Sequence, residues 1–330
     1  MTTQFDRESA RQETVTALAA APSKARAALI AEYQKRSRDA YAPETLRNYL
    51  LIKKLFEEWC ADVGVDPNPP ISPKNVARYV DFMAGRLRAT TIETRLWGIA
   101  ELHRAAFQPN PCRHELVKLA LKSAKRKYGA GPRQAPPLCK REVVDAINAL
   151  GNSRQELRDK AVLWTATDSW CRASELVALK VEDLLRQDDG TSLLFISRSK
   201  TDQFGNGDYA FLSEAGTKAV LAWIELANLK PNDPMFTKSQ RNARIQPMDP
   251  ATISRIIKRC LRRNDVSAHS MRVGGVHDAF RLGCDLSSIM VAGRWRSPEM
   301  PARYGRRILA SQSAAAQVSA AFAKDENKKE

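Results

Sequence analysis

The chain has 330 residues, 43% of them hydrophobic, which is enough to form more than one buried core. Its 53 Lys and Arg residues exceed its 37 Asp and Glu residues, and the resulting net charge of +16 favours a polyanionic partner, with nucleic acid ahead of an anionic membrane surface. No stretch approaches the roughly 20 apolar residues that span a bilayer, and the N-terminus lacks the apolar segment of a signal peptide, so we expect a cytoplasmic protein. The six cysteines are scattered without a C-x-x-C pair, which indicates reduced thiols rather than a zinc or redox site.

The first part of the chain predicts a helical domain. Residues 1–20 are polar and without pattern, so we expect them to be disordered. Pro43 then stands at the head of an apolar stripe, and Ser72 is placed as an N-cap in front of a proline. The segments TTIETRLWGIAELHRAAF and HELVKLALKSAKRKYG predict two further helices. We expect a compact DNA-binding domain of four or five helices over residues 21–126.

A change of composition separates this domain from a second one. Residues 127–138 contain two Gly and three Pro with few apolar anchors, which predicts a linker. The second domain, over residues 139–309, begins with helical patterns and then contains two short strand patterns, 193–198 and 209–212, on either side of a GNG turn signal. Helical patterns follow, and residues 310–330 predict a C-terminal helix and a charged tail. The fold class is therefore mainly α, a two-domain clamp whose second domain has a small antiparallel hairpin.

Cationic side chains gather on elements of both domains. In the first domain the candidates for DNA contact are Arg47, Lys53, Arg95 and Lys122. In the second domain, cations at i, i+3, i+4 and i+7 face away from a stripe of isoleucines: Arg255, Lys258, Arg259 and Arg262. Such a stripe is usually a solvated face, but in a chain of this charge it becomes a candidate to enter the major groove of DNA. A membrane-binding helix would carry large exposed apolar residues beside its cations, and no such band is present.

The stretch SAHSMRVGGVHDAFRLG places His269 three residues before Arg272, on one side of a helix. Phosphodiester transfer needs cations on the non-bridging oxygens, a nucleophile, and an acid for the leaving oxygen. Arginine is suited to the first task because its planar fork binds two phosphate oxygens. Further candidates stand in order along the second domain: Arg172, Glu175 one turn later, Lys200 at the mouth of the hairpin, Trp295, and Tyr304, the only tyrosine after Tyr209.

This ordered set resembles the tyrosine site-specific recombinases of the phage integrase family. The resemblance extends over nearly the whole chain, because YAPETLRNYLL and TTIETRLWGIAELHRAAF are similar to the DNA-clamping helices of that family. It implies that Tyr304 attacks the scissile phosphate to form a 3′-phosphotyrosine, while Arg172 and Arg272 clamp the phosphate. The other implied roles are orientation of Arg172 by Glu175, protonation of the leaving 5′-oxygen by Lys200, proton transfer at the tyrosine by His269, a hydrogen bond to the phosphate from Trp295, and DNA contacts by Thr90, Thr91 and Thr94.

The resemblance also implies the partners. It predicts double-stranded DNA with inverted-repeat sites and a homotetramer on two such sites, which exchanges strands through a Holliday junction. No metal or other cofactor is implied, because the phosphotyrosine conserves the bond energy for rejoining. The C-terminal segment can form a narrow apolar face that would dock on a neighbouring protomer or pack on its own domain: Ile308, Leu309, Ala315, Val318 and Phe322.

Several alternatives stay open. Lys200 has Arg198 and Lys180 near it in sequence as competing proton donors, and His277 is expected to be structural. A type IB topoisomerase would use the same chemistry, and a catalytically idle DNA-binding regulator would retain only the binding surfaces. The intact set from Arg172 to Tyr304 argues against the regulator.

Overall fold

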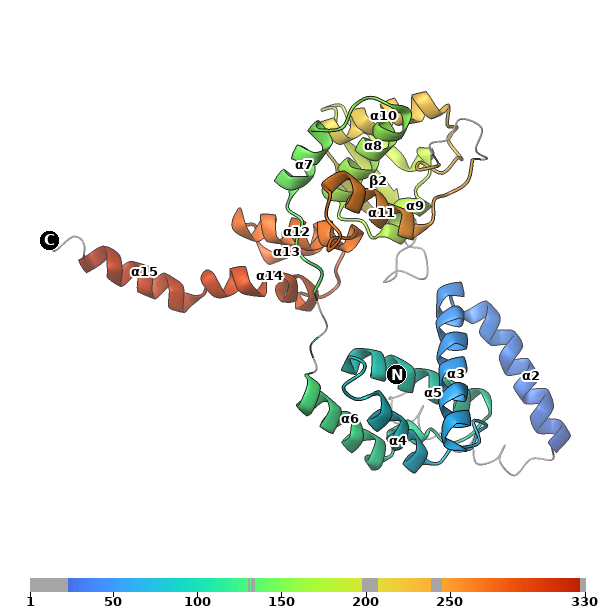
Figure 1. Cartoon of the computed structure of the whole chain (residues 1–330). Coiled ribbons are helices and arrows are strands. Elements are labelled where there is room, and N and C mark those ends of the chain that lie inside the picture. The colour runs from blue at the N-terminus through green and yellow to red at the C-terminus, as the bar shows by residue number, and fades with distance from the viewer. Residues whose placement is uncertain (1–22, 130, 132–133, 198–206, 239–244, 327–330) are drawn as a thin grey trace, which may run out of the picture. The chain divides into compact units, whose positions relative to one another are not determined.

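The computed structural model describes residues 23–129, 131, 134–197, 207–238 and 245–326. The chain folds as two compact units, Met1–Arg133 and Gln134–Glu330, and the division falls within the Gly- and Pro-rich segment. Both units are mainly helical, and the second contains a three-stranded antiparallel sheet (Figure 1), so the predicted mainly α class with a small antiparallel sheet is confirmed. Within the described ranges, no helix is both long and apolar enough to cross a membrane. The predicted disorder of residues 1–20 lies outside the described residues.

The first unit is built from helices around one core. Its elements are α2 (Ser23–Ala40), α3 (Pro43–Val63), α4 (Pro73–Met83), α5 (Ala89–Ala105), the 3₁₀ turn η1 (Pro111–Arg113) and α6 (Glu115–Tyr128). The start signals act as predicted, since Pro43 opens α3 and the Ser72 side chain accepts a hydrogen bond from the Asn75 N–H at the start of α4. Helix α2 was not among the predicted helices, because none of its described side chains is buried and its apolar pattern is correspondingly weak.

Aromatic side chains from α3 and α4 form the centre of this core. The Phe56 and Tyr79 rings lie 5.0 Å apart, and the Trp59 and Tyr79 rings lie 4.9 Å apart. The apolar stripe predicted on α3 is correct for Ile52, Phe56 and Trp59, which are buried, but Leu50 is 61% exposed. The core therefore lies under one face of α3, and the opposite face remains open to solvent.

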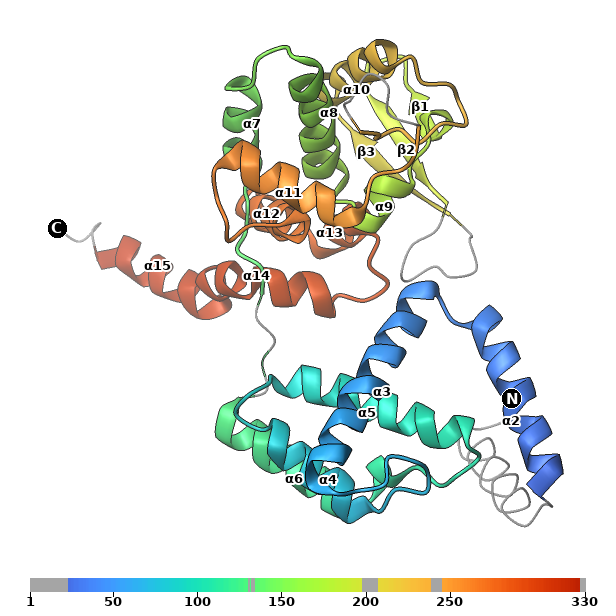
Figure 2. The same cartoon turned by 45° about the vertical axis from the view of Figure 1, so that its right-hand side comes forward.

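The second unit places a small sheet beside a helical layer (Figure 2). Its first elements are α7 (Lys140–Asn148), α8 (Arg154–Ser169), α9 (Ala173–Ala178), η2 (Val181–Asp183), β1 (Leu184–Arg186), β2 (Ser192–Ile196), β3 (Asp208–Leu212) and α10 (Glu214–Ala227). Strands β2 and β3 form the predicted hairpin, with Leu194 opposite Ala210. The sequence missed β1, a three-residue strand that pairs with the other side of β2 and is too short to show alternation.

The remaining helices include the one that carries the stretch SAHSMRVGGVHDAFRLG. They are α11 (Pro250–Leu261), α12 (Ala268–Arg281), α13 (Leu286–Gly293), α14 (Glu299–Ser311) and α15 (Ala314–Glu326). Helix α12 is buried along most of its length, and α13 and α14 lie beside it in both views (Figures 1 and 2). The two glycines of HSMRVGG allow other segments to approach α12 closely, because a Cβ at Gly274 would lie 1.8 Å from the Leu138 carbonyl oxygen and one at Gly275 would lie 2.2 Å from the Trp170 indole nitrogen.

The C-terminal segment differs from the prediction of one helix after residue 309. Helix α14 continues to Ser311, and a separate helix, α15, begins at Ala314. Ile308 and Leu309 pack against the core that contains Tyr304, whereas Val318 and Phe322 on α15 are 55% and 68% exposed. The predicted apolar face is therefore divided, and only its second half is uncovered.

Candidate active site

Tyr304 lies on α14 and is held at both ends. Its hydroxyl oxygen lies 2.9 Å from Nε2 of His269, at the start of α12. Its main-chain carbonyl accepts hydrogen bonds from Nε2 of His277, at 3.0 Å, and from Nε2 of Gln134, at 3.2 Å. His277 therefore has the structural place expected of it, and it fixes the backbone of the candidate nucleophile. The Tyr304 residue as a whole is only 7% exposed.

Arg272 is fixed by backbone carbonyls and an aromatic ring. Its Nη1 donates to the carbonyl of Trp170 at 2.6 Å, and its Nη2 donates to the carbonyl of Gly293. The guanidinium carbon lies 4.2 Å from the centre of the Trp295 ring. Gly293 allows this arrangement, because a Cβ there would lie 1.8 Å from the Trp295 ring. A guanidinium has five N–H groups, so donors remain for a phosphate after these bonds are made.

Glu175 connects Arg172 to a second arginine. Arg172 is the N-cap of the short helix α9, and its N–H donates to Oε2 of Glu175 at 2.9 Å while its guanidinium donates to Oε1. Arg294 donates from Nη2 to the same Oε2, also at 2.9 Å. The Arg172 side chain retains 22% of its exposure, whereas those of Glu175 and Arg294 retain 2% each. Arg172 is thus the member of this group that reaches toward solvent.

The charges in the site support one another. Burial is the largest influence on Glu175 and acts to raise its pKa, but the Arg172 N–H and the charges of Arg294 and Arg172 together hold that pKa below its ordinary value. Burial first, then the charges of Arg172 and Arg294, lower the pKa of Arg272 to about 10. At neutral pH the carboxylate is therefore ionised and the Arg272 guanidinium is charged.

The Tyr304 and His269 pair is neutral at the same pH. Burial raises the pKa of Tyr304, against the opposing charges of Arg272 and Arg172. Partial desolvation lowers the pKa of His269, followed by the charges of the same two arginines, although part of the residue is exposed at the surface. A phenol and a neutral imidazole 2.9 Å apart form a proton donor and acceptor pair.

The Trp295 ring contacts both Arg272 and Tyr304. Its ring is 5.9 Å from that of Tyr304 and 6.4 Å from that of Trp170. These hydrogen bonds and ring contacts bring together six of the seven predicted catalytic residues: Arg172, Glu175, His269, Arg272, Trp295 and Tyr304. The seventh, Lys200, lies outside the described residues, as does its competitor Arg198. The other competitor, Lys180, is described, and its Nζ donates to Glu182 at 2.9 Å.

Sequence reasoning missed two residues of the site. Arg294 stands beside Trp295 in the sequence, but nothing in its spacing indicates that its side chain turns inward to Glu175. Trp170 contributes a main-chain carbonyl, which no side-chain motif can reveal. The GRW tripeptide could have indicated that Arg294 lies near the site, because it directly precedes the predicted catalytic residue Trp295. It could not have indicated which group the Arg294 side chain binds.

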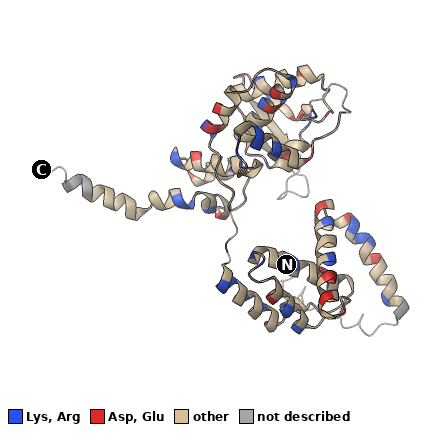
Figure 3. Ribbon diagram, viewed as in Figure 1, with Lys and Arg blue, Asp and Glu red and all other residues tan. Residues whose placement is uncertain are grey.

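The predicted DNA contacts of the first unit lie on α3, α5 and α6. Arg47 is exposed and pairs with Glu44, and Lys53 is 3.6 Å from Glu57. On α5, Thr91 and Thr94 are exposed and Thr90 is half-buried, while Arg95 donates to the Tyr79 hydroxyl at 3.3 Å. Lys122 on α6 is exposed. These positions leave all seven side chains with solvent-facing surface, and the lysines and arginines of α6 are visible in Figure 3.

The cationic face predicted on α11 is present with one correction. Arg255 and Arg259 are exposed and Lys258 is half-buried, opposite three buried isoleucines. Arg259 also forms an ion pair with the buried carboxylate of Asp159. Arg262 is not on this face, because the helix ends at Leu261 and Arg262 adopts the left-handed conformation, with φ at 53°. The predicted i+7 position fails because the helical period stops one residue earlier.

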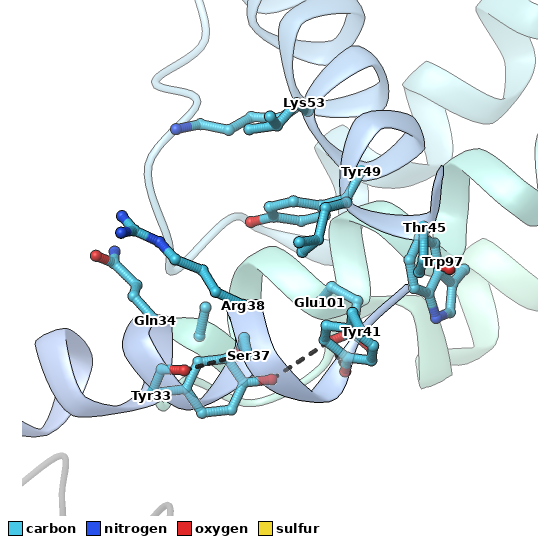
Figure 4. Close-up of a pocket in the computed structure, with 13 residues that line it drawn as sticks. Tyr33, Gln34, Ser37, Arg38, Tyr41, Thr45, Tyr49, Lys53, Trp97 and Glu101 are labelled. Atoms are coloured by element: carbon cyan, nitrogen blue, oxygen red, sulfur yellow. Dashed lines mark hydrogen bonds between the residues drawn. The ribbon is translucent and has the colours of Figure 1, made fainter. Parts of the chain in front are cut away.

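A pocket of about 480 Å³ lies in the first unit, between α2, α3 and α5 (Figure 4). The hydroxyl of Tyr33, on α2, donates a hydrogen bond to the buried Glu101 at 3.4 Å. The hydroxyl of Tyr41, the residue after α2, donates to the same carboxylate at 3.1 Å. Lys53 lies at its rim. The Glu101 carboxylate is thus satisfied within the unit, and the pocket shares only Lys53 with the predicted DNA-contact residues. In the described part of the chain, no group of three or more His, Cys, Asp or Glu side chains has a metal-binding arrangement.

Comparison with known proteins places this site in a family. Residues 138–308 match the phage integrase family. The integrase/recombinase xerD homolog of Selenomonas ruminantium is 27% identical over 292 residues, which cover 82% of this chain and 84% of the relative. Recombinase cre of Escherichia phage P1 is 27% identical over 301 residues, which cover 83% and 87%.

Solved structures show the same fold. The Tn1549 transposon integrase in complex with transposon right end DNA superposes with a TM-score of 0.59 at 15% identity, covering 84% of this chain and 93% of that one. The XerH site-specific recombinase in a post-cleavage complex with palindromic difH substrate gives 0.58 at 17% identity, covering 85% and 82%. The lambda integrase tetramer bound to a Holliday junction gives 0.55 at 15% identity, covering 82% and 77%. The family match spans more than half of the chain and contains the whole site around Tyr304, so the chain belongs to the phage integrase family and is a tyrosine recombinase.

Proposed function

We propose that Tyr304 is the nucleophile of a site-specific DNA recombination reaction. The observation that carries this proposal is the 2.9 Å contact between its hydroxyl and Nε2 of His269, beside Arg272 and Arg172. The phenol oxygen would attack the scissile phosphorus, and its proton would pass to His269. The bond from phosphorus to the 5′-oxygen breaks, which leaves a 3′-phosphotyrosine and a 5′-hydroxyl. A tyrosine whose pKa is raised needs such a base, and a histidine whose pKa is lowered is free to act as one.

Arg172 and Arg272 would bind the non-bridging oxygens of the phosphate. Both keep N–H donors beyond those used within the protein, and both are held rigidly, Arg172 by Glu175 and Arg272 by two carbonyls. Donors that are fixed before the reaction stabilise developing charge without reorganising. Their rigid support is therefore an argument for a role in the transition state.

The two remaining roles concern the leaving group and the phosphate. Lys200 would protonate the 5′-oxygen as it leaves. The Trp295 indole N–H makes no hydrogen bond to any part of the chain that the structure describes, so it is available to the phosphate. Its ring already lies under Arg272, which would also bind that group.

The substrate would be double-stranded DNA with inverted-repeat sites, contacted by both units. The support is the net charge of +16 and the exposed cations on α3, α6 and α11. The XerH structure contains a palindromic substrate, and the lambda integrase structure is a tetramer on a Holliday junction. We propose the same kind of substrate and a homotetramer on two sites for this chain, which would act in the cytoplasm.

Helix α15 would link the protomers of that tetramer. Its exposed Val318 and Phe322 form an apolar surface that the described residues of its own unit do not cover. Truncation after Ser313 keeps α14 intact and removes this surface. We expect binding to a single half-site to change little, cooperative filling of a full site to weaken, and recombination to be lost. Cooperative binding and normal recombination by the truncated chain would contradict this role.

The chemistry itself is tested by Tyr304→Phe. The variant should bind DNA but form no covalent protein–DNA adduct, measured on DNA carrying candidate inverted repeats from the genomic neighbourhood. Tyr209→Phe, on β3, is the matched control and should keep the adduct. An adduct that persists in Tyr304→Phe would contradict the assignment. Joining to a partner strand, rather than relaxation of supercoils alone, separates recombination from the type IB topoisomerase reaction.

A further inference from the structure

Arg294 is buried at the end of a helix in a conformation that turns its side chain inward. It is the C-cap of α13, with φ at 54° and ψ at 44°, and the residue is 6% exposed. Lysine and arginine side chains are rarely buried to this extent unless they are paired, because removing the charge from water is unfavourable. A partner of opposite charge must therefore compensate Arg294.

That partner is the carboxylate that also holds Arg172. Arg294 donates from Nη2 to Oε2 of Glu175 at 2.9 Å and from Nη1 to the carbonyl of Ser169 at 3.0 Å. Glu175 receives the Arg172 guanidinium on its other oxygen. Nε of Arg294 is buried without a hydrogen-bond partner among the described residues. Arg294 is thus held in place at some energetic expense, which suggests that its position matters for more than stability.

The residues on either side of Arg294 hold the second arginine of the site. The Gly293 carbonyl accepts a hydrogen bond from Arg272, and the Trp295 ring lies 4.2 Å from the Arg272 guanidinium. At the C-terminal end of α8, two successive main-chain carbonyls also hold these two arginines. The Ser169 carbonyl accepts a hydrogen bond from Arg294, and the Trp170 carbonyl accepts one from Arg272. Residues 293–295 and 169–175 therefore hold Arg272 between them, and Arg294 joins the two segments directly.

We propose that Arg294 is a positioning residue that sets the geometry of both phosphate-binding arginines, Arg172 through Glu175 and Arg272 through the segment 293–295. The inference rests on the proposed function, because it assigns Arg294 a role in the reaction that Arg172 and Arg272 carry out. Arg294 itself would not touch the DNA. Its loss would leave the phosphate-binding arginines present but less well placed.

The competing explanation is that Arg294 only neutralises a buried carboxylate. The chain contains a control for it, because Arg158 likewise donates to a buried carboxylate, that of Asp159, at 2.7 Å, and its side chain is 8% exposed. Arg158→Met and Arg294→Met each remove one buried guanidinium and leave an unbranched apolar side chain in place of the aliphatic part of the arginine. Both should lower the melting temperature, and only Arg294→Met should impair cleavage.

The experiment measures DNA affinity and the single-turnover rate of adduct formation separately. We expect Arg294→Met to bind DNA within about twofold of the wild type and to cleave about ten to a hundred times more slowly, as a misplaced catalytic geometry does. Arg158→Met should cleave at the wild-type rate. If Arg294→Met fails to fold, Arg294→Lys serves instead, because it keeps the charge but cannot bond both Glu175 and the Ser169 carbonyl through one planar fork. Wild-type cleavage in whichever variant folds overturns the inference.

A double variant tests the route through Glu175. Glu175→Gln and Arg294→Met act on one linkage, so their combined effect on cleavage should be close to the larger single effect. Effects that multiply would overturn the role assigned to Glu175 in this linkage. Failure of the proposed function is recognised independently, because the wild-type chain would then form no Tyr304-dependent adduct at all.

Discussion

Two buried carboxylates of the second unit each hold two arginines, and the comparison shows how one arrangement can serve two surfaces. Glu175 pairs with the buried Arg294 and with Arg172, whose side chain is 22% exposed. Asp159 pairs with the buried Arg158 and with Arg259, whose side chain is 49% exposed. In each group the inner arginine compensates the carboxylate, and the outer arginine is fixed while it faces outward.

The surroundings of the two outer arginines differ. The charge of Arg172 acts on both Tyr304 and His269: it opposes the rise that burial causes in the pKa of Tyr304, and it adds to the fall that burial and Arg272 cause in the pKa of His269. Arg259 instead stands on α11 on the same face as Arg255, and it is not among the charges that shift the pKa of Tyr304 or of His269. Chemistry is therefore expected at Arg172 and DNA binding at Arg259, the two outer arginines, although both groups consist of the same ionic parts.

The largest expected effect compares the two outer arginines directly. Arg172→Ala should raise the barrier to cleavage by about 3 kcal/mol, roughly a hundredfold in rate, because a fixed donor to the transition state is lost. Arg259→Ala should leave the cleavage rate at saturating DNA unchanged. Both are measured by single-turnover adduct formation, and equal defects in the two variants would remove the distinction between the groups.

A smaller effect is expected from pH, and only at the group near Tyr304. His269 must be neutral to accept the phenolic proton, and its lowered pKa keeps it neutral at pH 7. Cleavage should fall only as the pH drops through that lowered pKa, by about tenfold per unit below it. The pH–rate profile of His269→Gln should lack this limb, and a profile that retains it would assign the limb to another group.

The smallest effect concerns salt. Each cation of α11 that contacts a phosphate should contribute about 0.9 to the slope of log affinity against log salt. Arg255→Ala with Lys258→Ala should therefore reduce the slope by about two, while Arg172→Ala should change it by about one at most. DNA-binding titrations at several salt concentrations test this. An unchanged slope in the double variant would mean that the cationic face of α11 is exposed to solvent and does not contact DNA.

The local signals of the sequence were sufficient for most helices and for the order of the active-site residues. Pro43 and Ser72 predicted the starts of helices because capping depends on a few neighbouring residues, while most of the GNG turn signal lies outside the described residues. They failed where an element lacks a local signature, as in β1 and α2, or where a period stops early, as at Arg262. The C-terminal stripe was likewise divided by a helix end that its composition does not mark.

The sequence by itself determined the chemistry available to the protein: a basic, mainly helical chain with arginines, a histidine, a tryptophan and a late tyrosine in order. Those properties follow from residue types and short spacings. Only the tertiary structure decided that Glu175 is shared with Arg294, 119 residues away, and that the carbonyls of Trp170 and Gly293 hold Arg272. Main-chain carbonyls are present at every residue, so only packing determines which of them remain free at a helix end to accept a buried guanidinium.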